Sequence, residues 1–308
     1  MKVSLKAEII QAQAAFSPVE RIDGRLDAGV IVVCDHAANA LPPGYGSLGL
    51  PREALDRHIA YDIGAAWLTR RLGRLLDAPA ILSTFSRLLI DPNRGADDPT
   101  LVMRLSDGAI VPGNARIDEA EIARRRQLYW APYRNAIAQT VDAMSATEVL
   151  PAVISVHSFT PTWRGAARPW KVGVLWDADP RLPAPLLQAL ALEDDLSSDE
   201  IGDNEPYDGA LAGDTIDDIA TARGLANALI EVRQDLIAEQ DYAEAWAERL
   251  ARLIRPILAR PDMREAADWG TRACTKCTGR QAPAGLDAGA AASHGSPPPF
   301  SSTQRNIA

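Results

Sequence analysis

The sequence is poor in cysteine and has no long hydrophobic run. Three cysteines occur among 308 residues, namely Cys34, Cys274 and Cys277, which is too few for the disulfide framework of a small secreted protein. No apolar run reaches the ~18 residues of a membrane-spanning helix, and the first residues lack the apolar core of a signal peptide. These absences predict a protein of a reducing compartment, and we expect it to be cytoplasmic and not to bind membranes.

Basic residues are also in the minority. The chain has 32 Lys and Arg residues and 41 Asp and Glu residues, and therefore a net charge of −9. This charge argues against nucleic-acid binding through the overall electrostatic attraction of the protein. A local group of arginines can still bind a small anion. Hydrophobic residues make up 47% of the chain and charged residues 24%, a balance that excludes disorder over most of the length.

Apolar runs of strand length alternate with amphipathic helical stretches. The runs are nearly continuous, as in strands that are covered on both faces; they occupy 29–34, 80–90, 152–156, 172–176 and 228–233. The clearest helices are expected at 52–76 and 118–144. This alternation predicts an α/β fold, with one domain over residues 1–260 whose mostly parallel central sheet is flanked by helices.

Two segments resemble functional motifs without their usual context. Residues 44–49 match the GxGxxG pattern, but residues 35–43, which include two prolines, separate them from the preceding strand, so we expect a loop and not a nucleotide site. Residues 261–308 are rich in Ala, Gly, Pro and Ser, which predicts a disordered tail. The Cys274-x-x-Cys277 pair lies in this tail without a second pair, so a structural zinc site there is not expected.

Polar residues follow several of the predicted strands. His36 follows the first strand, His157 follows the run at 152–156, and Glu231 and Arg233 share one face of the last strand. Open α/β sheets bind ligands at this carboxyl edge. Two imidazoles and a carboxylate are typical of a zinc hydrolase, in which a further carboxylate acts as general base. The alternative for either histidine is an ordinary hydrogen-bonding loop residue.

Asp62, Arg87 and the Asn93-Arg94 pair are further candidates. On the expected helix at 52–76, Asp62 falls within an apolar stripe, and a buried carboxylate needs either a metal or a polar partner. Arg87 and Arg94 are expected at either end of a short strand within the segment 86–94. Asn93 and Arg94 suit a substrate carboxylate, although Arg94 has Asp91 and Asp97 nearby for structural ion pairs. The polar loop at 202–209 is either a lid or an acidic surface loop.

Together the motifs resemble the N-formylglutamate amidohydrolase family. The resemblance spans about residues 20–260 and includes VVCDHAANALP, HIAYDIG, FSRLLIDPNR, RRRQLYWAPYR, SVHSFTP, RPWKVGVL, GDNEPY and LIEVRQDLI. The family is similar in fold to zinc-dependent carboxypeptidases and aspartoacylases. The resemblance therefore implies a zinc-exopeptidase-like, or phosphorylase/hydrolase-like, fold.

The resemblance also implies a Zn²⁺ ion and its ligands. His36 and His157 would bind the zinc, with Asp62 as the preferred third ligand and Asn39 as the competing one. Glu231 matches the glutamate that activates the attacking water.

The remaining implied roles concern the substrate. Arg87 would polarise the scissile carbonyl or hold the oxyanion, whereas Asn93, Arg94 and Arg233 would bind the substrate. The chain departs from the family where Arg134 and Ile219 replace expected histidines, which puts formylglutamate itself in doubt.

The function expected from these motifs is zinc-dependent hydrolysis of the amide of an N-formyl or other N-acyl amino acid, with an acidic side chain. One alternative is a catalytically silent relative that binds an amino-acid-like ligand. Another is a hydrolase for peptides or other N-acyl amino acids. The expected partner is thus a small molecule and not a nucleic acid, and the sequence leaves the oligomeric state open.

Overall fold

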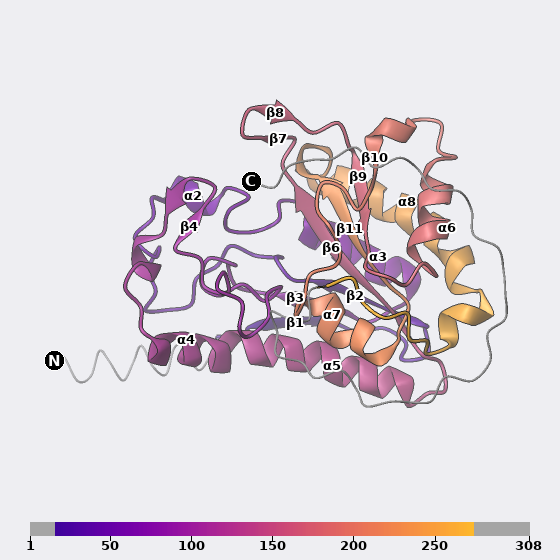
Figure 1. The fold of residues 1–308 in the computed structure, drawn as a ribbon, viewed down its shortest axis with the longest axis horizontal. Coiled ribbons are helices and arrows are strands. Elements are labelled where there is room, and N and C mark those ends of the chain that lie inside the picture. The colour runs from indigo at the N-terminus through magenta and orange to yellow at the C-terminus, as the bar shows by residue number, and fades with distance from the viewer. Residues whose placement is uncertain (1–15, 274–308) are drawn as a thin grey trace.

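A seven-stranded sheet runs through residues 16–273, which are the residues that the computed structural model describes (Figure 1). Its strand order is β1-β3-β2-β6-β11-β9-β10. The four neighbouring strands β3, β2, β6 and β11 are parallel, whereas β1 and β9 run antiparallel to β3 and β11. The bounds are Val19–Ile22 for β1, Val30–Cys34 for β2, Ala80–Ser83 for β3, Ala152–Phe159 for β6, Val172–Leu175 for β9, Ile201–Asp203 for β10 and Asn227–Arg233 for β11. The predicted mostly parallel sheet is confirmed.

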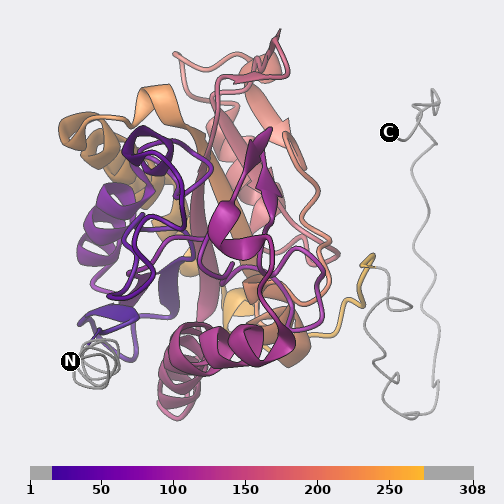
Figure 2. The same cartoon turned by 90° about the vertical axis from the view of Figure 1, so that its left-hand side faces the viewer.

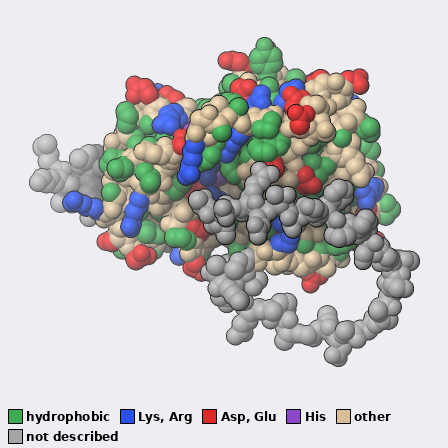
Figure 3. Space-filling model, turned by 45° about the horizontal axis from the view of Figure 1, so that its top comes forward, with side chains coloured by type: hydrophobic (Ala, Val, Ile, Leu, Met, Phe, Trp, Pro, Cys, Tyr) green, Lys and Arg blue, Asp and Glu red, His purple; other side chains and the backbone are tan. Residues whose placement is uncertain are grey.

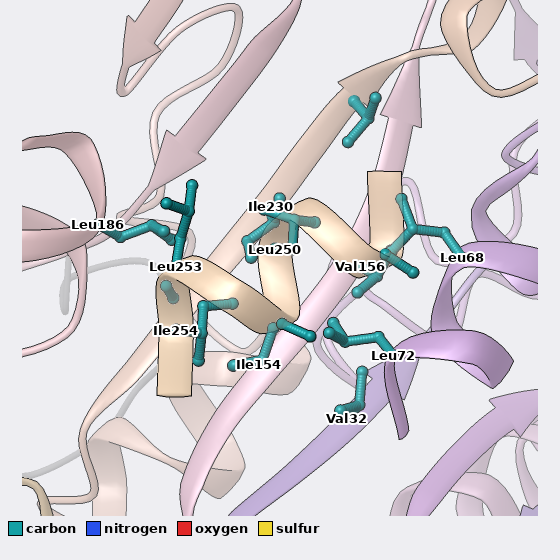
Figure 4. Packing of buried hydrophobic residues seen from close by; sticks show 14 of the residues in the cluster. Val32, Leu68, Leu72, Ile154, Val156, Leu186, Ile230, Leu250, Leu253 and Ile254 are labelled. Atoms are coloured by element: carbon teal, nitrogen blue, oxygen red, sulfur yellow. The ribbon is translucent and has the colours of Figure 1, made fainter. Parts of the chain in front are cut away.

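Helices cover both faces of this sheet. On one face lie α3 (Ala65–Leu76), α6 (Pro183–Leu190) and α8 (Gln240–Leu258), with α3 and α8 packed together (Figure 2). On the other face lie α5 (Ala131–Ser145) and α7 (Thr215–Ile219). Because strand side chains alternate, successive residues of one strand serve both cores: Val32 packs towards α3 and α8 (Figure 4), and Val33 towards α5. This double burial explains the uninterrupted apolar runs.

The helix predicted at 118–144 is present, but the one predicted at 52–76 is interrupted. The first consists of α4 (Glu119–Arg125), the π-helical turn η2 (Arg126–Trp130) and α5, and Asp118 caps it by accepting from the Glu121 backbone N–H. In the second, α2 covers Arg52–Leu55 and the chain turns until α3 begins at Ala65. Asp62 therefore lies in a loop, and its predicted place on a helical stripe was wrong, although its predicted burial holds.

The strand predicted at 80–90 is also shorter than expected. β3 ends at Ser83, and a buried loop follows, in which the Ser86 backbone N–H donates to the Ala40 carbonyl and its hydroxyl donates to the Ala60 carbonyl. Arg87 and Arg94 thus project from one loop and do not mark the ends of a strand. The glycine-rich segment 44–49 is a run of turns, as predicted.

Two short hairpins and several 3₁₀ turns complete the described fold. β4 (Leu105–Ser106) pairs with β5 (Ala109–Ile110), and β7 (Thr162–Trp163) pairs with β8 (Ala166–Ala167). The 3₁₀ turns are η1 (Pro112–Asn114), η3 (Ser198–Glu200), η4 (Thr221–Arg223), η5 (Gln234–Leu236) and η6 (Pro261–Arg264). No helix within residues 16–273 is both long enough and apolar enough to span a membrane.

The C-terminal segment 261–273 packs against the domain, although it was predicted to begin a disordered tail. Met263 is buried in the α3–α8 core, and the Ala267 N–H donates to the Gly224 carbonyl. Arg272 pairs with Asp177 and Asp208. The folded part therefore continues beyond residue 260. The rest of the predicted tail, with Cys274 and Cys277, lies outside the described residues.

Candidate functional site

A pocket of about 480 Å³ lies at the carboxyl edge of the parallel strands. It brings together seven of the predicted site residues, namely His36, Asp62, Arg87, Asn93, Arg94, His157 and Glu231. In the space-filling view, basic side chains border a recess on this side of the molecule (Figure 3). Segments that are far apart in sequence thus meet at the edge where open α/β sheets place ligands.

The sheet positions the central side chains directly. Glu231 of β11 lies opposite His157 of the parallel strand β6, and the pleat sends both side chains to the same face. His36 follows β2 after Asp35, and its carbonyl accepts a hydrogen bond from the Asp62 backbone N–H at 2.9 Å. This bond fixes the loop before α3 against the end of β2.

His36, Asp62 and His157 form a candidate metal centre. Their nearest ligand atoms all lie within 4.8 Å of one another, and the three side chains are buried. Asp62 Oδ2 is 2.8 Å from His157 Nδ1 and 3.4 Å from His36 Nδ1. Two imidazole nitrogens and one carboxylate oxygen are the donor set of catalytic zinc sites that keep one position open. These residues therefore fit a zinc ion.

The structure separates the two candidates for the third ligand. Asp62 faces both imidazoles, whereas Asn39 is absent from the pocket wall. The Asn39 amide nitrogen instead donates to the Leu55 carbonyl at 2.8 Å. The geometry favours Asp62.

Each imidazole also has a buried carboxylate on its far side. His36 Nε2 lies 2.7 Å from Asp91, and His157 Nε2 lies 3.2 Å from Asp35. Asp35 is further fixed by the hydroxyl groups of Ser155 and Thr215. Carboxylates in this position fix the ring orientation of metal-binding histidines. Neither role was expected from the sequence, in which Asp91 was a possible partner for Arg94 only; the one signal was the place of Asp35 and Asp91 next to the ends of predicted strands.

These contacts shift the pKa values of the cluster. Burial alone would raise the pKa of Asp62, but the two imidazoles hold it well below its ordinary value. Burial would lower the pKa of His157, but hydrogen bonds to Asp35 and Asp62 raise it well above 6.5. The pKa of Asp91 is likewise well below its ordinary value, despite burial, because Arg87 and His36 lie beside it. The cluster is held together by charge as well as by geometry.

Glu231 is a buried carboxylate, and one of its oxygen atoms makes no hydrogen bond with the described residues. The residue is 6% exposed, and no hydrogen-bond partner for its Oε2 atom exists among the described residues. Burial, reinforced by the nearby charge of Asp62, raises its pKa to about 7. A carboxyl group of this kind can both accept and return a proton near neutral pH.

The two pocket arginines, Arg87 and Arg94, differ in their carboxylate partners. Arg87 donates to Asp91 at 2.9 Å and lies 3.6 Å from Asp62. Arg94 contacts the Thr100 hydroxyl and the Asn93 carbonyl, and no carboxylate of residues 16–273 lies within ion-pair distance of it. The alternative considered for Arg94, a structural ion pair with Asp91 or Asp97, is therefore not formed.

Three residues discussed from the sequence lie outside the pocket wall. Arg233 pairs with Asp235 and donates to the carbonyls of residues 168–170. Arg134 is buried and donates to backbone carbonyls and to Asp218. Ile219 belongs to the core beneath α5. The positions where histidines were expected thus do not line this pocket.

Several pocket residues were not expected from the sequence. His58 lines the wall and lies 3.2 Å from Asp107. The β4–β5 hairpin contributes Asp107, and the β7–β8 hairpin contributes Trp163. Tyr207 of the loop at 202–209 also lines the pocket. The family resemblance contained this tyrosine, but periodicity and spacing gave no sign of its position.

Known proteins share this sequence and fold. Residues 28–238 match the family model of N-formylglutamate amidohydrolase, whereas no curated protein matches the sequence. The crystal structure of gene product Atu2144 from Agrobacterium tumefaciens is 32% identical, covers 80% of this chain and 97% of its own, and has a TM-score of 0.74. N-formylglutamate amidohydrolase from Ralstonia eutropha JMP134 has a similar fold at 21% identity, with a TM-score of 0.59 over 79% of this chain and 97% of its own. The chain belongs to the N-formylglutamate amidohydrolase family, whose members are hydrolases of amide bonds.

Proposed function

We propose that this protein is a zinc-dependent amidohydrolase that removes the formyl group, or another small acyl group, from an N-acyl amino acid with an acidic side chain. The observation that carries the proposal is the convergence of His36, Asp62, His157 and Glu231 in one pocket with an arginine, Arg94, that has no carboxylate partner among the described residues. Family membership supports the amide as the reacting group.

His36, Asp62 and His157 would hold the zinc ion. When bound, zinc supplies a Lewis acid that polarises the acyl carbonyl and acidifies water. Asp35 and Asp91 keep both imidazoles turned towards Asp62, because each accepts from the opposite ring nitrogen.

Glu231 and Arg87 carry the proton transfer and the charge stabilisation. Glu231 takes the proton of the attacking water and passes it to the leaving amine, a role supported by the unpartnered Oε2 atom. Arg87 holds the oxygen of the acyl group while negative charge develops on it. Its guanidinium is kept in place by Asp91.

Asn93 and Arg94 bind the substrate carboxylate. The Thr215 backbone N–H donates to Asn93 Oδ1 at 3.0 Å, so the Asn93 NH₂ group points elsewhere, and it finds no acceptor among the described residues. Beside it, Arg94 is the pocket arginine without a carboxylate partner in residues 16–273. An amide and a guanidinium side by side donate in parallel to a carboxylate.

A panel of N-acyl amino acids tests the proposal. We expect purified protein to contain about one zinc per chain and to hydrolyse N-formylglutamate faster than N-formylleucine, N-acetylglutamate or a dipeptide. Chelation should abolish turnover, and added zinc should restore it. Preferred cleavage of a dipeptide would indicate a peptidase. A protein that takes up no zinc and cleaves none of the panel would contradict the proposal and favour a binding protein.

A further inference from the structure

The loop at 202–209 is packed backbone against backbone, which fixes Tyr207 at the pocket wall. Asn204 Oδ1 accepts from the backbone N–H groups of both Trp176 and Gly209, at 2.9 and 3.0 Å. A Cβ atom at Gly173 of β9 would lie 2.1 Å from the Glu205 carbonyl oxygen, and one at Gly209 would lie 2.2 Å from the Trp176 nitrogen. The loop is therefore packed into the wall and is not a free lid, while its acidic side chains Asp203, Glu205 and Asp208 are exposed at the surface, as the surface-loop alternative expected.

The hydrogen bonding of Tyr207 leaves its proton available. Arg168 Nη1 lies 3.1 Å from the Tyr207 hydroxyl oxygen. A guanidinium can only donate, so Tyr207 accepts this bond. No acceptor for the Tyr207 O–H lies within hydrogen-bond distance among residues 16–273. Arg168 is itself buried and held by Thr160, so the phenol oxygen is fixed while its O–H is free to donate.

Tyr207 lies in the same pocket as the reacting groups. It lines the wall together with Asp62, Arg87 and Glu231. Tyr207 is 45% exposed, but the partial burial of its hydroxyl end, with the charges of Glu231 and Asp62, raises its pKa above the ordinary value of 10, so the phenol keeps its proton at neutral pH. A protonated phenol beside a base and a guanidinium is suited to hydrogen-bond donation and not to proton abstraction.

We propose that Tyr207 is a further catalytic residue, which donates a hydrogen bond to the substrate acyl oxygen as that oxygen becomes an oxyanion, and that Arg168 is its positioning residue. The inference rests on the proposed function, because it assigns a second donor, beside Arg87, to the same oxygen. It also implies that Tyr207 acts on the transition state more than on the bound substrate.

Tyr207→Phe removes this hydroxyl and keeps the ring. We expect kcat for N-formylglutamate to fall about 10- to 100-fold, with KM within about threefold. Zinc content and Tm should stay as in the wild type. Tyr242→Phe, at an exposed position of α8 outside the pocket, is the matched control and should leave kcat unchanged. An unchanged kcat for Tyr207→Phe would overturn the inference and leave the proposed function standing.

A binding measurement gives a readout that does not need turnover. The probe is 2-(phosphonomethyl)pentanedioate, in which a charged tetrahedral phosphonate replaces the formamide of N-formylglutamate. Calorimetry should show that Tyr207→Phe binds this probe about 10- to 100-fold more weakly, and glutamate equally well. Equal loss for both ligands would indicate a general effect on the pocket and would overturn the inference.

Arg168→Met tests the positioning role. We expect it to lower kcat as Tyr207→Phe does, and we expect the double variant to be no worse than Tyr207→Phe alone, since both changes remove one interaction. Additive losses would contradict the role of Arg168. If the wild-type protein neither cleaves the panel nor binds the phosphonate, the proposed function fails, and the role of Tyr207 fails with it.

Discussion

At the scale of single residues, the candidate centre consists of two imidazoles that are each held between two carboxylates. Residue chemistry and strand position were enough to predict that His36, His157 and Glu231 meet in one pocket, because the carboxyl ends of parallel strands lie at one edge of the sheet. The partners Asp35 and Asp91 could not be predicted. Their roles depend on which imidazole nitrogen each carboxylate contacts. That distance is set by the three-dimensional fold and cannot be derived from the sequence.

Glu231→Gln removes the general base while keeping the size of the side chain. We expect turnover to fall by about 10²- to 10⁴-fold, with zinc content unchanged because Glu231 is not among the candidate ligands. Steady-state kinetics and metal analysis on the same preparation check this. Hydrolysis at the wild-type rate would sink the assignment of the base.

Arg94→Ala removes the pocket arginine that forms no ion pair with a carboxylate in the part of the chain that the structure describes. KM should rise about 10- to 100-fold, because a hydrogen-bonded charge contributes about 1.5–3 kcal/mol, while kcat changes little because the contact is equal in ground and transition states. Arg252→Ala is the control, since Arg252 pairs with Glu193 outside the pocket wall. A loss confined to kcat would instead place Arg94 at the reacting carbonyl.

At the scale of elements, the sequence predicted strands better than helix ends. Central strands are buried on both faces and can be predicted from their continuous apolar runs. The interruption of the helix predicted at 52–76, in contrast, is caused by a residue far away in the sequence. Gly64 has a φ of +83°, and a Cβ there would lie 2.0 Å from the Ile237 carbonyl oxygen. The helical periodicity of the sequence continues through Asp62. It carries no information about the Ile237 carbonyl group, which lies far away in the sequence.

Gly64→Ala tests this close approach. It should destabilise the protein by at least about 2 kcal/mol more than Gly165→Ala, because Gly165 has a nearly equal φ of +82° but no atom within 4 Å of its Cβ position. Chemical denaturation of both variants measures the difference. Gly64→Ala should also weaken zinc binding, since Asp62 lies in the same loop. Equal losses for the two variants would show that the contact with Ile237 is unimportant.

The N-cap of α7 gives stability a pH dependence. Burial raises the pKa of Asp214 to about 7, against ~3.9 in an unfolded chain, so the folded state disfavours the charged form. The resulting stability is full below pH ~4 and is lost as the pH rises through 7. Asp214→Asn keeps a cap acceptor for the Asp217 N–H. We expect this variant to exceed the wild type in unfolding free energy at pH 8, on the order of 2 kcal/mol, and the gap to close at pH 4.5. A gap that does not vary with pH would contradict this account.

At the scale of the whole molecule, the order of the motifs predicted the parallel sheet and the edge where the site lies, because few chain paths satisfy alternating strands and helices. The C-terminal limit of the domain was predicted less well. Composition marks a change near residue 261, yet Met263 is buried and Ala267 is bonded to Gly224. A few anchoring residues in a segment of polar composition are enough to order it.

Shortening the chain tests that C-terminal limit. A protein ending at Arg260 should have a Tm at least about 5 °C below that of one ending at Ala273. It loses the buried Met263 side chain, for which truncation costs about 2–5 kcal/mol, and it leaves the buried Arg181 without the carbonyl groups of Asp262 and Glu265. Thermal unfolding of the two proteins is the measurement. Equal Tm values would show that residues 261–273 add nothing to stability.

The two short hairpins are suitable positions for changing the substrate specificity of the pocket. The predicted metal ligands and base belong to the sheet and the buried loops, whereas β4–β5 and β7–β8 reach the pocket only through Ser106, Asp107 and Trp163. Their remaining residues are largely exposed. Mutational libraries confined to residues 104–110 and 162–167 would therefore vary the walls around an acyl group or side chain without disturbing the chemistry. Sequence changes in these hairpins would let members of the family differ in substrate preference while sharing one reaction.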